Sequence, residues 1–310
     1  MIEFLLALAV ALILIYKAGD VFVDSACRIA RALGVSTAVI ALTFVAFGTS
    51  APEFFTSIIA ALQGNVGIAY GNVVGSNIVN ITPILALAAI FGVAIIGREQ
   101  FNEGLIMLFT GAALVLMALN GTIGFVGGLI LLAMFAFFLR FLFKREASKD
   151  REQITVERGE FWSSLLIFTI GLLGVILGSY LLVYSGVGMA KLMGVPEAAI
   201  GFTLVAIGTS IPELATILIS ISKKLYEVSV GTIVGSCIFN TTFIIGWAAL
   251  LRPLTIDSQA LFFSNPMMLV IMALLVGLMW GRQRLTRGHG LALLLFYVFY
   301  LVGLGFFYGG

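Results

Sequence analysis

The sequence predicts an all-α integral membrane protein with about ten transmembrane helices in two inverted five-helix repeats. Hydrophobic residues make up 61% of its 310 residues and charged residues only 10%, and the mean hydropathy is +1.15. Soluble domains carry about 25% charged residues, so this composition indicates a chain that lies largely in lipid. Two motifs also occur twice at one constant spacing, which indicates an internal duplication.

The duplication is visible in two pairs of segments. Residues 43–53 read TFVAFGTSAPE and residues 203–213 read TLVAIGTSIPE. Residues 71–80 read GNVVGSNIVN and residues 231–240 read GTIVGSCIFN. In both pairs the second copy begins 160 residues after the first, so the chain is expected to consist of two tandem halves.

Polar interruptions divide the chain into segments of about 20 apolar residues, the length that crosses the hydrocarbon core. The first half is expected to form helices at 2–18, 37–62, 68–95, 103–119 and 123–143. The second half is expected to form helices at 161–188, 197–222, 228–250, 265–281 and 289–308. Because each half holds an odd number of helices, the second enters the membrane from the opposite face. The first helix has no basic segment before it, so we do not interpret it as a removed signal peptide.

The expected domains are a first repeat at 1–143, a connector at 144–160 and a second repeat at 161–310. The connector has mixed charge, with the basic residues Lys144, Arg145, Lys149, Arg151 and Arg158 balanced by the acidic residues Glu146, Asp150, Glu152, Glu157 and Glu160. This mixed charge predicts a solvated linker that is too short to fold as a regulatory domain.

Basic residues predict the orientation. One side of the expected topology carries Arg28, Arg31, Arg98, Lys144, Arg145, Lys149, Arg151, Arg158, Lys223, Lys224, Arg282, Arg284 and Arg287, with Arg140 close by. The opposite side carries only Lys191 and Arg252. Cytoplasmic loops are enriched in Lys and Arg, so we expect a multi-pass protein of the cell membrane with both termini extracellular. The net charge of +2 then reflects topology, and no nucleic-acid partner is expected.

The duplicated motif places Glu53 and Glu213 directly after prolines within apolar segments. An ionisable residue at bilayer depth costs roughly 2.5–3.5 kcal/mol even on the mildest scales, so its default interpretation is functional. Thr49 and Thr209 lie one helical turn earlier on the same face. Pro52 and Pro212 lack an N–H and are expected to kink their helices and free carbonyl groups. Each motif thus offers carboxylate, hydroxyl and backbone oxygens for a cation.

The companion motif adds Ser76 and Asn80, and its copy adds Ser236 and Asn240. Glycines spaced four apart in both copies would let these helices pack closely. For single Ser and Thr residues, a role in helix packing alone remains an alternative, but it does not explain two carboxylates at matched positions. All candidate ligands are oxygens, which suits Ca²⁺ and Na⁺ rather than Zn²⁺ or Cu⁺. No nucleophile–base pair or cofactor motif is present, so we expect neither an enzyme nor a resident cofactor.

These four segments resemble the two α-repeats of the sodium/calcium exchangers, within the cation/calcium exchanger superfamily, and the chain is similar to its short prokaryotic members. The resemblance implies a secondary antiporter that exchanges Na⁺ for Ca²⁺ by alternating access. It implies about three Na⁺ per Ca²⁺, so that each cycle moves one charge and the membrane potential contributes roughly 2.3 kcal/mol per 100 mV. The implied partners are the lipid bilayer and the two ions, with no obligate protein partner.

The resemblance also implies roles for individual residues. Glu53 and Glu213 would hold Ca²⁺ alternately with Na⁺, helped by Thr49 and Thr209. Two Na⁺ sites toward either face would use Ala46, Ser50 and Ser76, and Ala206, Ser210 and Ser236. Asn80 and Asn240 would border the centre. The potassium-dependent exchangers and some prokaryotic members carry an acid where this chain has Asn240, which argues against K⁺ co-transport.

Two other functions remain open at this point. A Ca²⁺/H⁺ exchanger of the same superfamily is one, because a buried glutamate can also carry a proton. A cation channel is another, since acidic residues line selective pores. The serines that the resemblance assigns to Na⁺ favour the sodium exchanger, and inverted repeats favour a transporter over a channel. The first and sixth helices, which are poor in site residues, are our candidates for the elements that slide to alternate access.

Overall fold

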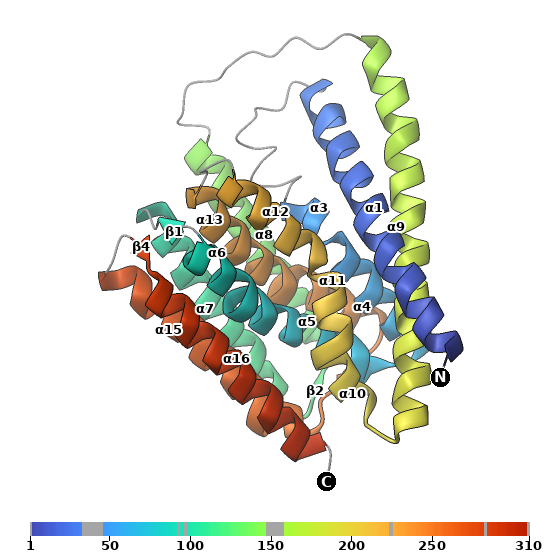
Figure 1. The fold of residues 1–310 in the computed structure, drawn as a ribbon, viewed down its shortest axis with the longest axis vertical. Coiled ribbons are helices and arrows are strands. Elements are labelled where there is room, and N and C mark those ends of the chain that lie inside the picture. The colour runs from blue at the N-terminus through green and yellow to red at the C-terminus, as the bar shows by residue number, and fades with distance from the viewer. Residues whose placement is uncertain are drawn as a thin grey trace.

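The computed structural model describes residues 2–32, 46–91, 94–95, 98–146, 158–222, 226–281 and 284–308. These residues form a bundle of helices with two short strand pairs, which confirms the all-α prediction (Figure 1). Within the described ranges, eight helices are long and apolar enough to cross a membrane, and Glu197–Thr209 is a shorter apolar helix.

The first half contains α1 (Ile2–Ala32), α3 (Ala46–Thr49), α4 (Ala51–Gln63), α5 (Val66–Val79), the π-helical η2 (Asn80–Ile84), α6 (Leu85–Phe91), β1 (Ala94–Ile95), α7 (Arg98–Ala118), β2 (Thr122–Ile123) and α8 (Phe125–Glu146). The second half contains α9 (Arg158–Met193), α10 (Glu197–Ile200), the π-helical η3 (Gly201–Val205), α11 (Ala206–Thr209), α12 (Ile211–Ser222), α13 (Tyr226–Phe239), the π-helical η4 (Asn240–Ile244), α14 (Ile245–Leu251), β3 (Leu254–Thr255), the π-helical η5 (Ala260–Ser264), α15 (Asn265–Gly281), β4 (Arg284–Leu285) and α16 (Arg287–Tyr308).

Several helices are longer than predicted, and α1 and α9 exceed their expected ranges most. The first was expected to end at residue 18, yet α1 continues to Ala32, and α9 extends past both ends of its expected range. Asp20, Asp24 and Arg28 on the extension of α1 are exposed, so these polar residues do not interrupt a helix that turns them outward. The expected helical residues 37–45 and the connector residues 147–157 lie outside the described part of the chain.

The long helices α1 and α9 run side by side at one edge of the bundle (Figure 1). Small residues let their backbones approach: a Cβ built on Gly171 would lie 2.8 Å from the Phe22 nitrogen, and one on Gly178 would lie 3.1 Å from the Ile15 nitrogen. Ring contacts continue the seam, with the Phe22 and Phe168 centroids 4.8 Å apart. Close backbone contact of this kind is how helices associate within lipid, so the two helices form one packed pair.

The two halves contain matched interruptions of their helices. At Ser50 and Ser210 the backbone leaves helical geometry, with φ and ψ of −87° and 9° at Ser50 and of −83° and 8° at Ser210. Each break lies two residues before the proline that predicted it, because proline has no backbone N–H with which to continue the helix. The π-helical segments η2 and η4 begin at Asn80 and Asn240, which are also 160 residues apart. The sequence did not predict these π-helical turns, which are frequent at functional sites.

Two short antiparallel strand pairs connect the halves. Ala94 of β1 pairs with Leu285 of β4, and Thr122 of β2 pairs with Thr255 of β3. Each pair joins a loop of the first repeat to a loop of the second. The strands therefore link the repeats through backbone hydrogen bonds at the ends of the helices, in addition to the packing between helices.

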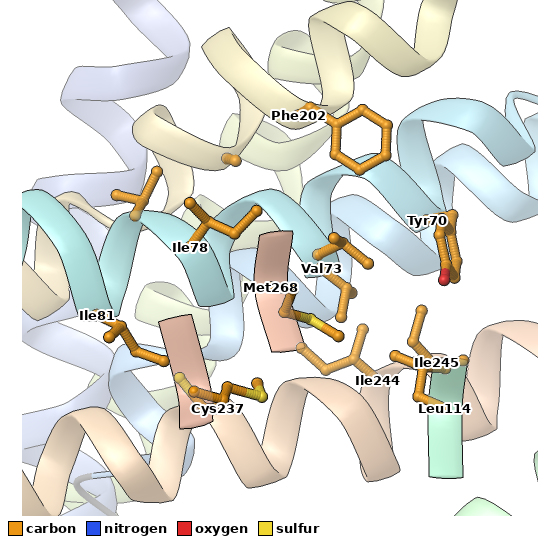
Figure 2. Close-up of a cluster of buried hydrophobic side chains, with 14 of the residues drawn as sticks. Tyr70, Val73, Ile78, Ile81, Leu114, Phe202, Cys237, Ile244, Ile245 and Met268 are labelled. Atoms are coloured by element: carbon orange, nitrogen blue, oxygen red, sulfur yellow. The ribbon is translucent and has the colours of Figure 1, made fainter. Parts of the chain in front are cut away.

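Helices α5 and α13 contribute buried side chains to a central hydrophobic cluster (Figure 2). On another face, α5 packs tightly against η3 and the helices on either side of it. A Cβ built on Gly71 would lie 2.9 Å from the Ala198 carbonyl oxygen. One built on Gly75 would lie 2.7 Å from the Phe202 carbonyl oxygen and 2.7 Å from the Ala206 Cβ. Glycine is required here because backbone from the other repeat occupies the space of a side chain.

We predict that Gly75→Ala destabilises the protein, whereas Gly277→Ala does not. The added methyl at residue 75 would overlap backbone of η3, and such overpacking costs about 1–3 kcal/mol. Gly277 lies on the exposed side of α15, where a Cβ meets nothing within 4 Å. Thermal unfolding of both variants in detergent, followed by size-exclusion chromatography, measures the difference. Equal midpoints for the two variants would contradict the close approach of α5 and η3.

Candidate ion-binding site

The two buried glutamates lie where the broken helices resume. Glu53 is in the first turn of α4 and Glu213 is in the first turn of α12, and both side chains are fully buried. Unpaired N–H groups and the helix dipole place partial positive charge at a helix N-terminus, which favours a carboxylate there. The local breaks at Ser50 and Ser210 thus create two environments that tolerate an acid inside the bundle.

Each glutamate accepts a hydrogen bond from the opposite repeat. Ser50 Oγ donates to Glu213 Oε1 over 2.9 Å, and Ser210 Oγ donates to Glu53 Oε1 over 3.0 Å. Ser210 is the counterpart of Ser50, and Glu213 is the counterpart of Glu53, at the offset of 160 residues. The internal pseudo-symmetry therefore relates the two hydrogen bonds to each other. The two repeats therefore build one site rather than two separate ones.

Several buried polar atoms around the glutamates have no hydrogen-bond partner within the described structure. They are Glu53 Oε2, Glu213 Oε2, Thr56 Oγ1, Asn240 Oδ1 and both polar side-chain atoms of Asn80. An unsatisfied buried polar group costs about 1–3 kcal/mol, and more if it is charged. All but one of these atoms are oxygens, the ligand type that Na⁺ and Ca²⁺ prefer. The donor set therefore fits a hard cation bound between the two carboxylates.

Most predicted hydroxyl residues lie beside the glutamates. Ser50 Oγ also donates to Ser236 Oγ over 3.1 Å. Ser76 Oγ lies 3.4 Å from Thr209 Oγ1 and donates to the Ala206 carbonyl oxygen over 3.4 Å. Thr49 is buried and ends α3, so the helix break separates it from the first turn of α4. Ala46 begins α3, and its side chain lies outside the part of the structure that is described.

The two predicted asparagines begin matched π-helical turns but differ in their contacts. Asn240 Nδ2 donates to Asn77 Oδ1 over 3.2 Å. Asn80 and Asn240 are both buried, but neither polar atom of the Asn80 amide has a hydrogen-bond partner in the part of the chain that the structure describes. The pseudo-symmetry of the site is thus incomplete on the α5 and α13 side.

Sequence reasoning missed two residues that support the site. Asn72 Nδ2 donates to the Glu53 carbonyl oxygen over 3.1 Å and to Ser57 Oγ over 2.9 Å, and its Oδ1 accepts from Thr209 Oγ1 over 3.0 Å. Asn77 is the partner of Asn240. Both lie within the GNVVGSNIVN motif, which could have identified them. Comparison of the halves concealed them because their counterparts are Thr232 and Cys237.

The arrangement can neutralise a cation with two carboxylates and surround it with neutral oxygens. Among the described residues, no group of three or more His, Cys, Asp or Glu is placed to hold a metal ion. Two acids with several hydroxyl and amide oxygens suit a site that must release its ion as well as bind it. A larger number of negative charges would hold a divalent ion more tightly.

Comparison with known proteins gives consistent matches over nearly the whole chain. The family described as "Sodium/calcium exchanger protein" matches residues 3–144 and 163–306. The sodium/calcium exchanger MaX1 of Methanosarcina acetivorans is 31% identical, with 96% of this chain and 97% of that protein covered. The putative antiporter CaxA of Alkalimonas amylolytica is 32% identical, with 94% and 95% covered. A structure of the sodium-calcium exchanger NCX_Mj, soaked with Na⁺ and Sr²⁺, has a TM-score of 0.71 at 30% identity, with 97% and 98% covered.

We predict that Ser50→Ala and Ser210→Ala destabilise the cation-free protein by similar amounts, about 1–3 kcal/mol each, because each leaves a buried carboxylate oxygen without its donor. Ser185→Ala is the control, since the Ser185 hydroxyl bonds only to the Leu182 carbonyl of its own helix. Thermal unfolding at pH 8 without Na⁺ or Ca²⁺ gives the comparison. A loss no greater than that of the control would contradict the crosswise hydrogen bonds.

Proposed function

The chain belongs to the sodium/calcium exchanger family and is a multi-pass membrane transporter rather than an enzyme, and from this premise we propose that it exchanges Na⁺ for Ca²⁺ at Glu53 and Glu213. One observation carries the proposal: each of these buried carboxylates is held by a serine of the opposite repeat, and its second oxygen has no hydrogen-bond partner among the described residues. One Ca²⁺ neutralises both acids, and Na⁺ ions can use the same oxygens. The two loads therefore exclude each other, which couples their fluxes.

We also propose roles for the residues that supply neutral oxygens. Thr49 and Thr209 complete the central position, while Asn80 and Asn240 border it. Two outer Na⁺ positions use Ser50, Ser76 and Ala46, and Ser210, Ser236 and Ala206. The contacts of Ser76 with Thr209 and of Ser50 with Ser236 support this grouping, since each joins residues of both repeats.

The expected exchange of about three Na⁺ for one Ca²⁺ moves one net charge per cycle, so a potential of 100 mV contributes roughly 2.3 kcal/mol. The proposed topology places both termini outside the cell and the connector at 144–160 in the cytoplasm, with repeats at 1–143 and 161–310. The distribution of basic residues supports this orientation.

Alternating access is assigned to the pair α1 and α9. These helices pack against each other along a seam of small residues and aromatic rings. The crosswise hydrogen bonds, by contrast, join the broken helices of the two repeats to each other. A pair that slides over this core could cover the site from one face and then the other, while the carboxylates keep their serine partners.

We predict that Glu53→Gln and Glu213→Gln each abolish Ca²⁺ exchange while leaving the protein folded, because a single negative charge cannot neutralise a divalent ion. The measurement is ⁴⁵Ca²⁺ uptake into Na⁺-loaded proteoliposomes, with vesicles lacking a Na⁺ gradient as the background. Glu103→Gln is a matched control, since Glu103 is also a buried glutamate but lies in α7. Near-normal uptake by either site variant would exclude these residues as ligands, and uptake driven by a pH gradient without Na⁺ would favour Ca²⁺/H⁺ exchange.

We predict that wild-type exchange proceeds equally well without K⁺, and that Asn240→Asp makes exchange more sensitive to pH. The substitution adds a third acid near two others, and an ionised Asp cannot donate to Asn77 as the amide does. Initial rates at clamped potential, with K⁺ replaced by choline on both sides, test the first part. Rates of the variant between pH 6 and 9 test the second. Exchange that stops without K⁺ would show that this interpretation of Asn240 is wrong.

A further inference from the structure

A buried serine in the middle of α9 has no hydrogen-bond partner among the residues that the structure describes. Ser179 is fully buried, and its Oγ makes no hydrogen bond within those ranges. Serine and threonine within helices commonly donate to a carbonyl of the preceding turn, and on the same helix Thr169 and Ser185 do so, over 2.9 Å each. Ser179 therefore differs from its neighbours, and a buried hydroxyl without a partner is costly.

The contacts of α9 with the segment 200–208 show how far along the bundle Ser179 lies. A Cβ built on Gly186 would lie 3.3 Å from side-chain atoms of both Ile200 and Val205. One turn earlier on α9, Leu182 Cδ1 would lie 3.7 Å from a Cβ built on Gly208. As the residue number falls along α9, the contacted residue on the next segment rises, so the two segments are antiparallel.

Ser179 lies three residues before Leu182 on α9. Because the two segments are antiparallel, Ser179 lies opposite residues that follow Gly208, at the break at Ser210 and the first turn of α12. The distance from Gly186 to Ser179 along the helix is about 10 Å. The residues Val175, Ser179, Leu182, Val183 and Gly186 share the buried face of α9. Helix α9 also packs against α4, which carries Glu53. Ser179 is thus a hydroxyl on the core-facing side of α9 at the depth of the two glutamates.

The Ser179 hydroxyl has no counterpart in the first repeat. The counterpart of Ser179 at the 160-residue offset is Gly19 on α1, which has no side chain to offer. The seam between the two helices is otherwise matched, because Ala18 faces Gly171 and Gly178 faces Ala11. Only one helix of the pair therefore carries an oxygen toward the core at this level.

We propose that Ser179 is an additional cation ligand, supplied by α9 and outside the four motif segments. Its hydroxyl oxygen binds Ca²⁺ or Na⁺ when α9 covers the site, so the position of α9 depends on whether an ion is present. Because α1 has no equivalent group, the two long helices respond unequally to the ion. This inference rests on the proposed exchange function.

The first test compares three substitutions in proteoliposomes. Ser179→Ala should raise the apparent KM for Ca²⁺ about three- to tenfold, a loss typical of one weak neutral contact, with little change in kcat. Ser179→Thr keeps the hydroxyl and should restore the wild-type KM. Ser185→Ala removes a buried hydroxyl from the same helix and should leave the KM unchanged. An unchanged KM in Ser179→Ala, or a threonine variant as impaired as the alanine variant, would overturn the proposal.

The second test does not depend on transport. Ser179→Cys is introduced with both native cysteines replaced by alanine, and its rate of modification by a positively charged methanethiosulfonate reagent is measured with and without Ca²⁺. Ca²⁺ should slow the modification severalfold in Ser179→Cys, and less in Gly19→Cys. Equal slowing at both positions, or none at Ser179→Cys, would overturn the proposal. If the wild type fails to exchange Na⁺ for Ca²⁺, the proposed function fails, while this labelling still reports on Ser179.

Discussion

The structure is organised around the burial of two facing carboxylates in a bundle that is largely apolar. Glu53 and Glu213 are fully buried, and each is stabilised by a helix N-terminus and by one serine hydroxyl. Those helix N-termini exist at mid-bundle only because the helices break at Ser50 and Ser210. Broken helices within a membrane are tolerated where the freed backbone groups are buried in protein or line a site. The acids, the breaks and the surrounding hydroxyl groups thus depend on one another.

Close packing between the repeats is the second requirement, because the serine and the glutamate of each pair come from different halves. Gly71 and Gly75 on α5 allow backbone of the second repeat to approach within contact distance. The strand pairs β1–β4 and β2–β3 join the same two halves at the ends of their helices. A hydrogen bond of 2.9 Å between side chains 163 residues apart is maintained by these contacts, since hydroxyl and carboxylate groups alone would not hold two helices in register.

The sequence was sufficient to predict the repeats, the helix breaks and most of the candidate site. Glu53, Glu213, Ser50 and Ser210 could be identified because both copies of the motif contain them at one offset. The crosswise pairing could not be predicted, since it depends on how the repeats pack and not on spacing within either one. Asn72 was overlooked because its counterpart is Thr232, and a comparison of halves hides what only one half contains. The length of α1 was underestimated because its polar residues face outward.

The crosswise hydrogen bonds also constrain how such a chain could arise. Neither half carries the serine that its own glutamate uses, so a single half would bury an acid without that hydroxyl donor. Two copies of one half, inserted in opposite directions and related by a two-fold axis, would each donate to the other, because a two-fold interface makes every contact twice. An ancestor of half this length meets the requirement as an antiparallel homodimer that inserts in both orientations. Fusion of its two copies would then have freed each half to diverge, as the difference between Ser179 and Gly19 illustrates.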